Sequence, residues 1–356
     1  MTRIRSSIAL VVGCVWALGL GGAALAADMA MPTKAPPPPA PPPLDIHGFV
    51  EWDWESFLIN PQGQALIPRS TVTVVAGLDW VLYKNKAGFI NKFTVGGGAA
   101  TDWSDEFPGY WSFFDALSLG GRSANSALFD TVMFLTGSVT FGQYWTLGET
   151  FYNVYSNDVC QTTACGFGGG TIGFNVLLAN QLKLSFNDSF TGWPVTWNPY
   201  VTWFYEWPGP TGGTGFACFS CAPTGSDFFI GIDPTVSGKL WGMPWLTIKA
   251  PTYVTVGPTS FWGNGVAPGG ISVPSSGGVG VFTTGLTFIA SLGMWIPPNL
   301  GNWYAKAGFQ YYDVINAALQ QDNAFSVCGT PVLSASCSNW KTTDIVVGFA
   351  GIGVAF

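Results

Sequence analysis

The sequence predicts an all-β protein, a transmembrane antiparallel up-and-down β-barrel of about twelve strands. Of its 356 residues, 48% are hydrophobic and only 9% are charged, whereas soluble proteins carry roughly 25% charged residues. After residue 26 no apolar run reaches the roughly 18 residues that a membrane helix needs. Many segments instead alternate polar and apolar residues. Only helices and closed barrels satisfy every backbone polar group in lipid, so these observations favour a barrel.

The chain ends on a predicted strand, residues 342–356, with the sequence TTDIVVGFAGIGVAF. From Val346 onward the even positions are small or apolar, and alternate residues of a strand point to opposite faces. A terminal strand exposes an edge unless it is paired on both sides, and closing a barrel pairs it. The segment resembles the C-terminal strand of bacterial outer-membrane β-barrels, which typically ends in phenylalanine. The resemblance implies that Phe356 is the membrane-insertion signal, read by the barrel-assembly machinery.

The first predicted strand shows two distinct faces. In residues 46–58, Glu51, Asp53 and Glu55 share one face. The other face carries Val50, Trp52 and Trp54. Polar residues toward the lumen and apolar residues toward lipid form the pattern of a membrane barrel. The same phase analysis predicts strands at 46–58, 71–83, 88–100, 127–141, 144–156, 171–190, 199–207, 227–240, 244–257, 280–296, 303–314 and 342–356.

The strand count depends on residues 171–190, which form either one long strand or a hairpin that turns at Ala179 and Asn180. Apolar residues stay on even positions through the segment, which favours one strand and a total of about twelve. A three-residue turn would escape this argument, and a barrel of about fourteen strands is left open as the alternative. With about twelve strands, short links fall at one end and long links at the other, except for the longer link 191–198. This asymmetry matches periplasmic turns and outer loops.

The N-terminus has the features of an export signal in residues 1–26. Basic residues precede an apolar stretch, and Ala24-Leu25-Ala26 forms a small-x-small cleavage site. Cys14 loosely matches a lipoprotein box, but too few apolar residues precede it to favour that alternative. The mature protein is therefore expected to begin at Ala27 and to reside in the cell outer membrane.

Residues 27–45 are expected to form a proline-rich periplasmic arm, which includes MPTKAPPPPAPPP. Such a segment adopts an extended polyproline II conformation and builds no core. It acts either as a spacer or as a contact with the cell wall or a periplasmic partner. The leader and arm, AADMAMPTKAPPPP, resemble the start of many alphaproteobacterial outer-membrane proteins. The barrel domain is predicted to span residues 46–356.

The cysteines that remain after signal cleavage form local pairs, each within one predicted outer loop. The pairs are Cys160 and Cys165, Cys218 and Cys221, and Cys328 and Cys337. In an exported protein they favour disulfides within the loops, although the connectivity does not follow from sequence. Cys218 and Cys221 also match a redox C-x-x-C motif, but without its βαβ context. The chain has 1 histidine, and the cysteine pairs lack zinc-ligand spacing, so no metal and no cofactor is predicted.

Charged residues on the predicted inward faces are the candidate pore lining. They are Glu51, Asp53, Glu55, Asp79, Asp130 and Glu149 with Lys92 on the earlier strands, and Lys183, Lys239, Lys249 and Lys306 with Asp233 on the later strands. Partly segregated charges would order water in a hydrated lumen and select solutes by charge. Alternatively, these groups form ion pairs that fill a narrow barrel, since unpaired buried charges are costly. A barrel of about twelve strands lies between the filled and the open sizes.

The predicted outer loop 101–126 is the candidate constriction. Its acidic residues, which lie among many aromatic residues, are Asp102, Asp105, Glu106 and Asp115. Because exposed aromatic surface is a liability, the loop is expected to fold into the barrel mouth or to pack on neighbouring loops. The inward face of the last strand is apolar at Ile345, Val347 and Phe349. That face either lines a route for hydrophobic solutes or packs against the arm or an inserted loop.

No motif in the sequence predicts an enzyme. A serine–histidine hydrolase would need His47 as its base, and no serine stands in a nucleophile elbow. The glycine runs lack the lysine of a phosphate-binding loop. A net charge of −7 leaves no basic stripe for nucleic acid.

The predicted function is that of a porin-like channel for passive diffusion of small hydrophilic solutes or ions, with a weak cation preference from the acidic balance. The first alternative is a non-conducting surface barrel whose loops bind an external partner. The second is a barrel enzyme that acts on lipids. These predictions rest on architecture rather than on a recognised site. The expected partners are outer-membrane lipid, the barrel-assembly machinery and, through the arm, the cell wall, and the oligomeric state is left open.

Overall fold

The computed structural model describes residues 44–63, 65–67, 70–103, 128–156, 177–208, 225–262, 264–267, 271–274, 277–320, 323 and 343–356. Residues 44–356 form one compact unit. The predicted signal peptide and nearly all of the predicted arm lie outside the described residues.

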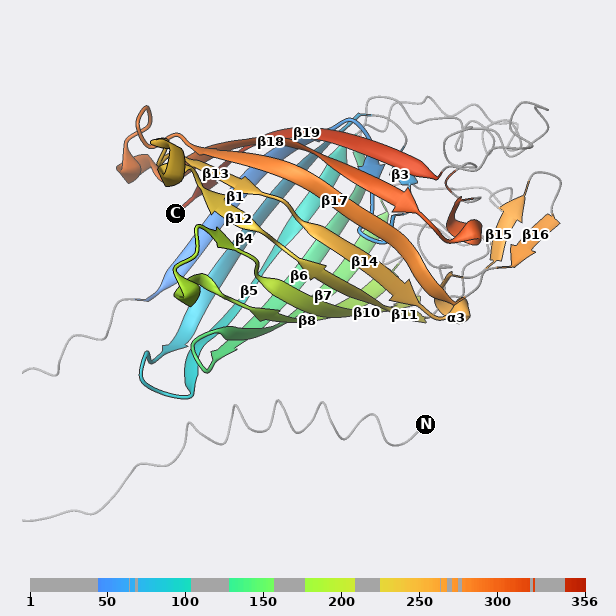
Figure 1. The fold of residues 1–356 in the computed structure, drawn as a ribbon, viewed down its shortest axis with the longest axis horizontal. Helices are drawn as coiled ribbons and strands as arrows, with labels where there is room; N and C mark the ends of the chain where they lie inside the picture. The colour runs from blue at the N-terminus through green and yellow to red at the C-terminus, as the bar shows by residue number, and fades with distance from the viewer. Residues whose placement is uncertain are drawn as a thin grey trace, which may run out of the picture. The chain divides into compact units, whose positions relative to one another are not determined.

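The described strands form a closed antiparallel barrel of 12 strands, as the sequence predicts. Figure 1 shows the tilted strands around the barrel. The wall consists of β1 (Ile46–Glu55), β4 (Thr71–Lys84), β5 (Ile90–Trp103), β6 (Leu128–Phe141), β7 (Trp145–Ser156), β8 (Leu177–Phe186), β10 (Pro199–Pro208), β11 (Gly225–Ile232), β14 (Thr252–Gly257), β17 (Gly278–Ser291), β18 (Asn302–Val314) and β19 (Asp344–Ala355). No helix among the described residues is long and apolar enough to cross a membrane.

The barrel closes where β1 pairs with β19, from Phe49 opposite Ala355 to Glu55 opposite Phe349. Beyond this ladder, the Gly48 N–H donates to the Phe356 carbonyl at 2.8 Å, and the Phe356 N–H donates back at 2.9 Å. The C-terminal strand therefore pairs on both sides, with β1 and with β18, which leaves no free edge.

The predicted choice of a single strand in residues 171–190 is confirmed for the described part. Ala179 and Asn180 lie within β8, opposite Tyr152 and Phe151 of β7, and no turn occurs there. The continuous phase of the apolar residues decided this correctly, because a side-chain period of two is broken by a tight turn.

Two of the predicted strands are interrupted, which corrects the predictions for 227–240 and 244–257. The first becomes β11 and β12 (Thr235–Ser237), separated at Pro234. The second becomes β13 (Leu246–Lys249) and β14, separated at Pro251. Proline has no N–H to donate to the ladder, so pairing stops at both sites. The two breaks lie side by side, since the Ala250 N–H donates to the Pro234 carbonyl at 2.9 Å.

The two ends of the barrel differ, as Figure 1 shows. We call the end near the C-terminus the turn end, and the opposite end the loop end. At the turn end, Gly142 and Gln143 link β6 to β7 with φ values of 54° and 71°, which a tight hairpin requires. The longer link between β8 and β10 is also ordered there, because the Asp188 carboxylate accepts the Trp197 N–H.

The remaining short elements lie at the ends of the barrel (Figure 1). At the turn end they are η2 (Ser189–Thr191), β9 (Val195–Thr196), η3 (Gly238–Trp241) and η4 (Pro298–Leu300). At the loop end they are β2 (Leu58–Ile59), β3 (Ala65–Ile67), α3 (Thr259–Trp262), β15 (Asn264–Ala267) and β16 (Ile271–Pro274).

An apolar core fills part of the loop end. It consists of Ile59, Trp262, Val281, Tyr312, Val314, Leu319, Ile345 and Val347. Ile59 comes from the first outer loop, residues 56–67, which turns inward rather than standing in solvent. Ile345 and Val347 therefore pack against an inserted loop, one of the alternatives that the sequence left open.

The first outer loop is fixed by hydrogen bonds as well as by apolar contacts. The Tyr253 hydroxyl donates to the Pro61 carbonyl at 3.0 Å, and the Asn323 amide donates to the Gly63 carbonyl at 2.8 Å. Gly63 has a φ of 82°, and a Cβ there would lie 2.4 Å from a methyl group of Val281. Glycine is therefore required at the point where this loop contacts the wall.

The outward face of the wall is apolar. Its exposed large side chains include Trp52, Trp54, Leu78, Trp80, Met133, Leu135, Val201, Trp203, Ile230, Phe288, Phe309, Val346 and Ile352. A continuous wall of this kind would be insoluble in water but matches a lipid environment. The closed barrel is therefore a transmembrane β-barrel of the outer-membrane type, as the sequence predicts.

Candidate channel lining

A group of charged side chains in close contact on the inward face joins β1 to β18. The Lys306 ammonium lies 2.6 Å from Glu51 Oε1 and 2.8 Å from Asp53 Oδ2. The Tyr304 hydroxyl donates a hydrogen bond to the second oxygen of Glu51. We call these four residues the β1–β18 charge cluster. The cluster orients two carboxylates and one ammonium toward the interior of the barrel.

This cluster reaches across β19, which lies between β1 and β18. The inward residue of β19 at that level is Gly351, opposite Asp53 on one side and Lys306 on the other. A Cβ on Gly351 would lie only 1.9 Å from Asp53 Oδ1. The glycines of the C-terminal strand thus leave the space in which Asp53 and Lys306 meet.

Closure of the barrel changes the predicted distribution of charge. Along the sequence, Lys306 belongs to a later, basic group and Glu51 to an early, acidic group. In the barrel the first and last strands are neighbours, so the two signs meet in ion pairs. The predicted segregation of charge is therefore partly cancelled, and the alternative of internal ion pairs is met at this site.

A second group of charges lies on β8, β10 and the β12–β13 region. The Lys183 ammonium is 4.1 Å from the centre of the Tyr200 ring, a cation–π contact. Lys249 lies 3.6 Å from Asp233. Both lysines face the lumen as predicted, and they keep a local basic character on this side of the wall.

Acidic groups near the loop end have fewer basic partners than Glu51 and Asp53 have. Asp102 is buried on β5 and accepts a hydrogen bond from the Thr73 hydroxyl. Glu55 lies within electrostatic range of Asp102 and Asp53. Neither Glu55 nor Asp102 has a lysine within ion-pair distance among the described residues. The position of Asp102 is a correction, because it belongs to the wall and not to the predicted constriction loop 101–126.

Glu149 is a second correction, because it faces outward and not toward the lumen. On β7 it shares a face with Trp145 and Leu147, which are both exposed. The Asn180 amide, also on the outward face, donates to Glu149 at 2.8 Å. The prediction failed because it assumed that every charged strand residue faces water.

Lys239 is a third correction, because it lies in η3 at the turn end rather than on a wall strand. The Ser237 hydroxyl accepts the Lys239 N–H at 3.4 Å and starts this turn. The break at Pro234 shortens the strand, so the predicted extension to residue 240 does not occur.

The other predicted lining residues take varied places. Asp79 faces inward and accepts a bond from the Thr136 hydroxyl at 3.4 Å. Lys92 shares the inward face of β5 with Thr94. The Asp130 backbone pairs with that of Asp102. Asp105, Glu106, Asp115, Cys160, Cys165, Cys218, Cys221, Cys328 and Cys337 lie outside the described residues.

Sequence reasoning missed two inward acids, Glu206 on β10 and Asp227 on β11. Asp227 is fully buried, and its carboxylate oxygens have no hydrogen-bond partner among the described residues. Alternation would have found both, because Glu206 follows Phe204 on the face opposite Trp203, and Asp227 precedes Phe229. No basic residue of the described part pairs with either.

His47 lies near the turn end, with its Nε2 2.6 Å from Asp45 Oδ1. Desolvation acts to raise the pKa of Asp45, but the His47 hydrogen bond and the charge of Lys84 lower it below its ordinary value. No serine hydroxyl bonds His47 among the described residues. Within the described ranges, no cluster of histidine, cysteine, aspartate and glutamate could bind a metal ion.

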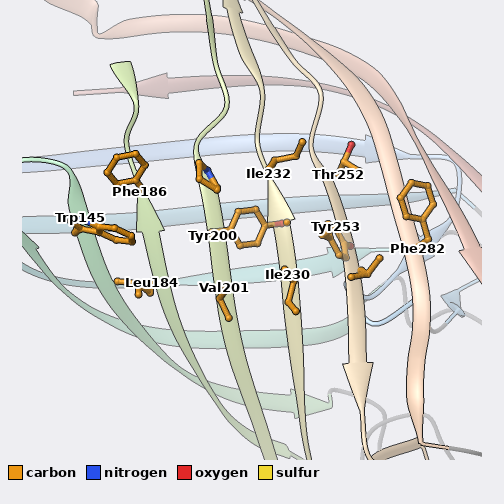
Figure 2. A pocket seen from close by; sticks show the side chains of 13 residues that line it. Trp145, Leu184, Phe186, Tyr200, Val201, Ile230, Ile232, Thr252, Tyr253 and Phe282 are labelled. Atoms are coloured by element: carbon orange, nitrogen blue, oxygen red, sulfur yellow. The ribbon is translucent and has the colours of Figure 1, made fainter. Parts of the chain in front are cut away.

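The outward wall also has an apolar groove of about 640 Å³. Figure 2 shows the side chains that line it, which come from β7, β8, β10, β11, β14 and β17. Leu184, Val201 and Ile230 are exposed here. The groove belongs to the membrane-facing surface and not to the lumen.

No family model matches the chain, and no curated protein matches it. Similar solved structures include the COG4313 outer membrane channel from Pseudomonas putida F1, with a TM-score of 0.41, 10% identity, and coverage of 89% of this chain and 97% of that chain. OmpT, an outer membrane protein of Vibrio cholerae, has a TM-score of 0.32, 9% identity and coverage of 88% and 97%. A porin has a TM-score of 0.29, 11% identity and coverage of 88% and 100%. In all three cases the sequence identity is low, and the similarity is confined to the general barrel architecture.

Proposed function

We propose that this chain is an outer-membrane channel through which small hydrophilic solutes or ions diffuse passively, with a weak preference for cations. The observation that supports the proposal best is the acidic inward face of the barrel. Its charged groups in the described part are Glu51, Asp53, Glu55, Asp79, Asp102, Glu206, Asp227 and Asp233, against Lys92, Lys183, Lys249 and Lys306.

The preference for cations follows from the acidic residues whose negative charge is not neutralised by a nearby lysine. Lys306 neutralises part of the charge of Glu51 and Asp53, and Lys249 does the same for Asp233. Among the described residues, neither Glu55 nor Asp102 has a lysine partner of this kind near the loop end. Acidic groups in a pore raise the local concentration of cations and lower that of anions. Because lysines also face the lumen, the selectivity is expected to be weak.

The proposal is tested by recording the reversal potential of the refolded mature protein in a planar bilayer under a salt gradient. The wild type is expected to give discrete conductance steps and a cation-selective potential. Glu55→Gln combined with Asp102→Asn should move the potential toward zero. Asp344→Asn is the control, because it removes a carboxylate from an exposed site outside the lumen, where that carboxylate accepts a hydrogen bond from the Tyr311 hydroxyl.

A bilayer that stays silent with demonstrably folded protein would overturn the channel and favour the surface barrel, whose loops bind an external partner. We also propose that the chain has no enzymatic role. His47 is bonded to Asp45 near the rim, which is a structural arrangement, so His47→Ala should leave lipid turnover at the background level. Turnover by the wild type that is lost in this variant would support the lipid enzyme instead.

A further inference from the structure

Glu149 and Asn180 form a polar pair on the membrane-facing wall. They lie on β7 and β8, and their outward neighbours Leu147, Leu182 and Phe151 are apolar. Asn180 donates to Glu149 at 2.8 Å, and Glu149 is exposed on the isolated barrel. In a monomer surrounded by lipid, a carboxyl and an amide would thus contact acyl chains.

The pair lies well inside the apolar band. Glu149 is four residues from Trp145, the first residue of the strand, at the level where membrane barrels place their aromatic girdle. At a rise of about 3.4 Å per residue and a tilt near 40°, it stands roughly 10 Å into a band about 25 Å tall. Acyl chains offer no hydrogen bonds at that depth, so polar groups there usually face protein rather than lipid.

The chemistry of the pair favours contact with the same surface of a second copy. Asn180 uses one amide hydrogen for its own Glu149, and its second amide hydrogen and its carbonyl oxygen can bond across an interface. Glu149 still offers its other oxygen. The outward faces of the described wall strands carry no lysine or arginine, so no other part of this wall offers a cation to Glu149. A two-fold contact pairs donors with acceptors reciprocally.

The surroundings of the pair also suit a protein contact. Leu135 on β6 is 66% exposed, and Met133 is 51% exposed. Next to them, Gly137 lies opposite Glu149 in register, and a Cβ added to Gly137 would meet no atom within 4 Å. The face therefore combines protruding apolar side chains with a recess beside the polar pair, which lets another surface approach Glu149 closely.

We propose that the outward face of β6, β7 and β8 is the contact between two copies of this chain in the membrane, with Glu149 and Asn180 at its centre. The inference does not depend on whether the barrel conducts. The mass of the folded protein tests it, measured in mild detergent by native mass spectrometry over a concentration series.

Glu149→Leu combined with Asn180→Leu should weaken association by roughly tenfold or more and yield monomers. The matched control is Thr252→Val with Thr284→Val, which removes another outward polar pair, bonded at 2.9 Å, on β14 and β17. The control should keep the wild-type mass. A wild type that is monomeric at every concentration, or a Glu149 variant with unchanged mass, would overturn the proposal.

A second measurement keeps the test valid if the double variant assembles poorly. A photoreactive residue in place of Leu135 should cross-link two copies in native membranes, whereas the same residue at the exposed Phe288 on β17 should not. Adducts of Leu135 with lipid alone, or with a different protein, would contradict a contact between copies. Equal cross-linking at both positions would show non-specific crowding and would also contradict it.

Discussion

Lys306 is the residue on which the interior of the first and last strands depends most. Its ammonium contacts two carboxylates, and its side chain is only 20% exposed. Without it, Glu51 and Asp53 would face each other with no cation in a partly buried site, where their side chains are 19% and 11% exposed. Removing one partner of a buried ion pair destabilises the fold more than replacing the whole pair with apolar residues, because the remaining charges stay buried without a counterion.

Lys306→Met should lower the free energy of unfolding by roughly 3 kcal/mol. Lys249→Met is the matched control, since its ion pair with Asp233 is longer, at 3.6 Å, and the lysine is 40% exposed. The control should cost less than about 1 kcal/mol. Urea unfolding of the barrel in lipid vesicles measures both values. Adding Glu51→Gln and Asp53→Asn to Lys306→Met should restore much of the loss, and no recovery would contradict the charge argument.

The first outer loop shows how an element between two strands can change the lumen. Leu58 and Ile59 are each 9% exposed, and Tyr253 and Asn323 bond the loop backbone from other parts of the chain. These contacts come from strands that are distant in sequence. The loop is thus an internal part of the loop end, where Ile59 packs against side chains of β17, β18 and β19.

Leu58→Ser combined with Ile59→Ser should release this loop and raise single-channel conductance by roughly twofold or more, because the constricted length of the route becomes wider. Leu240→Ser with Trp241→Ser is the control, since these exposed apolar residues lie in η3 at the turn end. Unchanged conductance in a folded double variant would mean that ions do not pass this loop.

At the scale of the whole molecule, Phe356 joins the last strand to the first. Its backbone exchanges two hydrogen bonds with Gly48, while its side chain stays 62% exposed. A Cβ on Gly48 would lie 2.4 Å from the Phe356 ring, so the ring covers that glycine. A change of the Phe356 side chain would keep these backbone hydrogen bonds. It would remove an insertion signal, because such a signal depends on the aromatic ring.

Phe356→Ala should therefore lower the amount of barrel assembled in cell membranes several-fold while changing urea stability of the refolded protein by less than about 1 kcal/mol. Heat modifiability on gels reports assembly, and unfolding in vesicles reports stability. Val354→Ala on the same outward face is the control. An equal loss of stability and assembly would show that the residue acts through packing alone.

Much of the fold followed from the sequence because a strand with one face in lipid and one in water alternates apolar and polar residues. The alternation shows which residues lie on each face. The alternation predicted the wall strands, the single strand at β8 and the inward position of Glu51, Asp53, Glu55, Lys183 and Lys306. Glu149 shows the limit of this reasoning. Its face is set by its apolar neighbours, and a charged residue can lie among them when it has a partner such as Asn180.

The sequence by itself determined the barrel, since period-two alternation and the low charge content leave no other way to satisfy the backbone in lipid. Only the tertiary structure decided which side chains meet. Closure brings Lys306 beside Glu51, the prolines at 234 and 251 break two neighbouring strands at one level, and the first outer loop enters the mouth. The physical reason is that periodicity records which face a residue occupies, whereas contacts across the barrel depend on register, closure and loop packing between residues far apart in the chain.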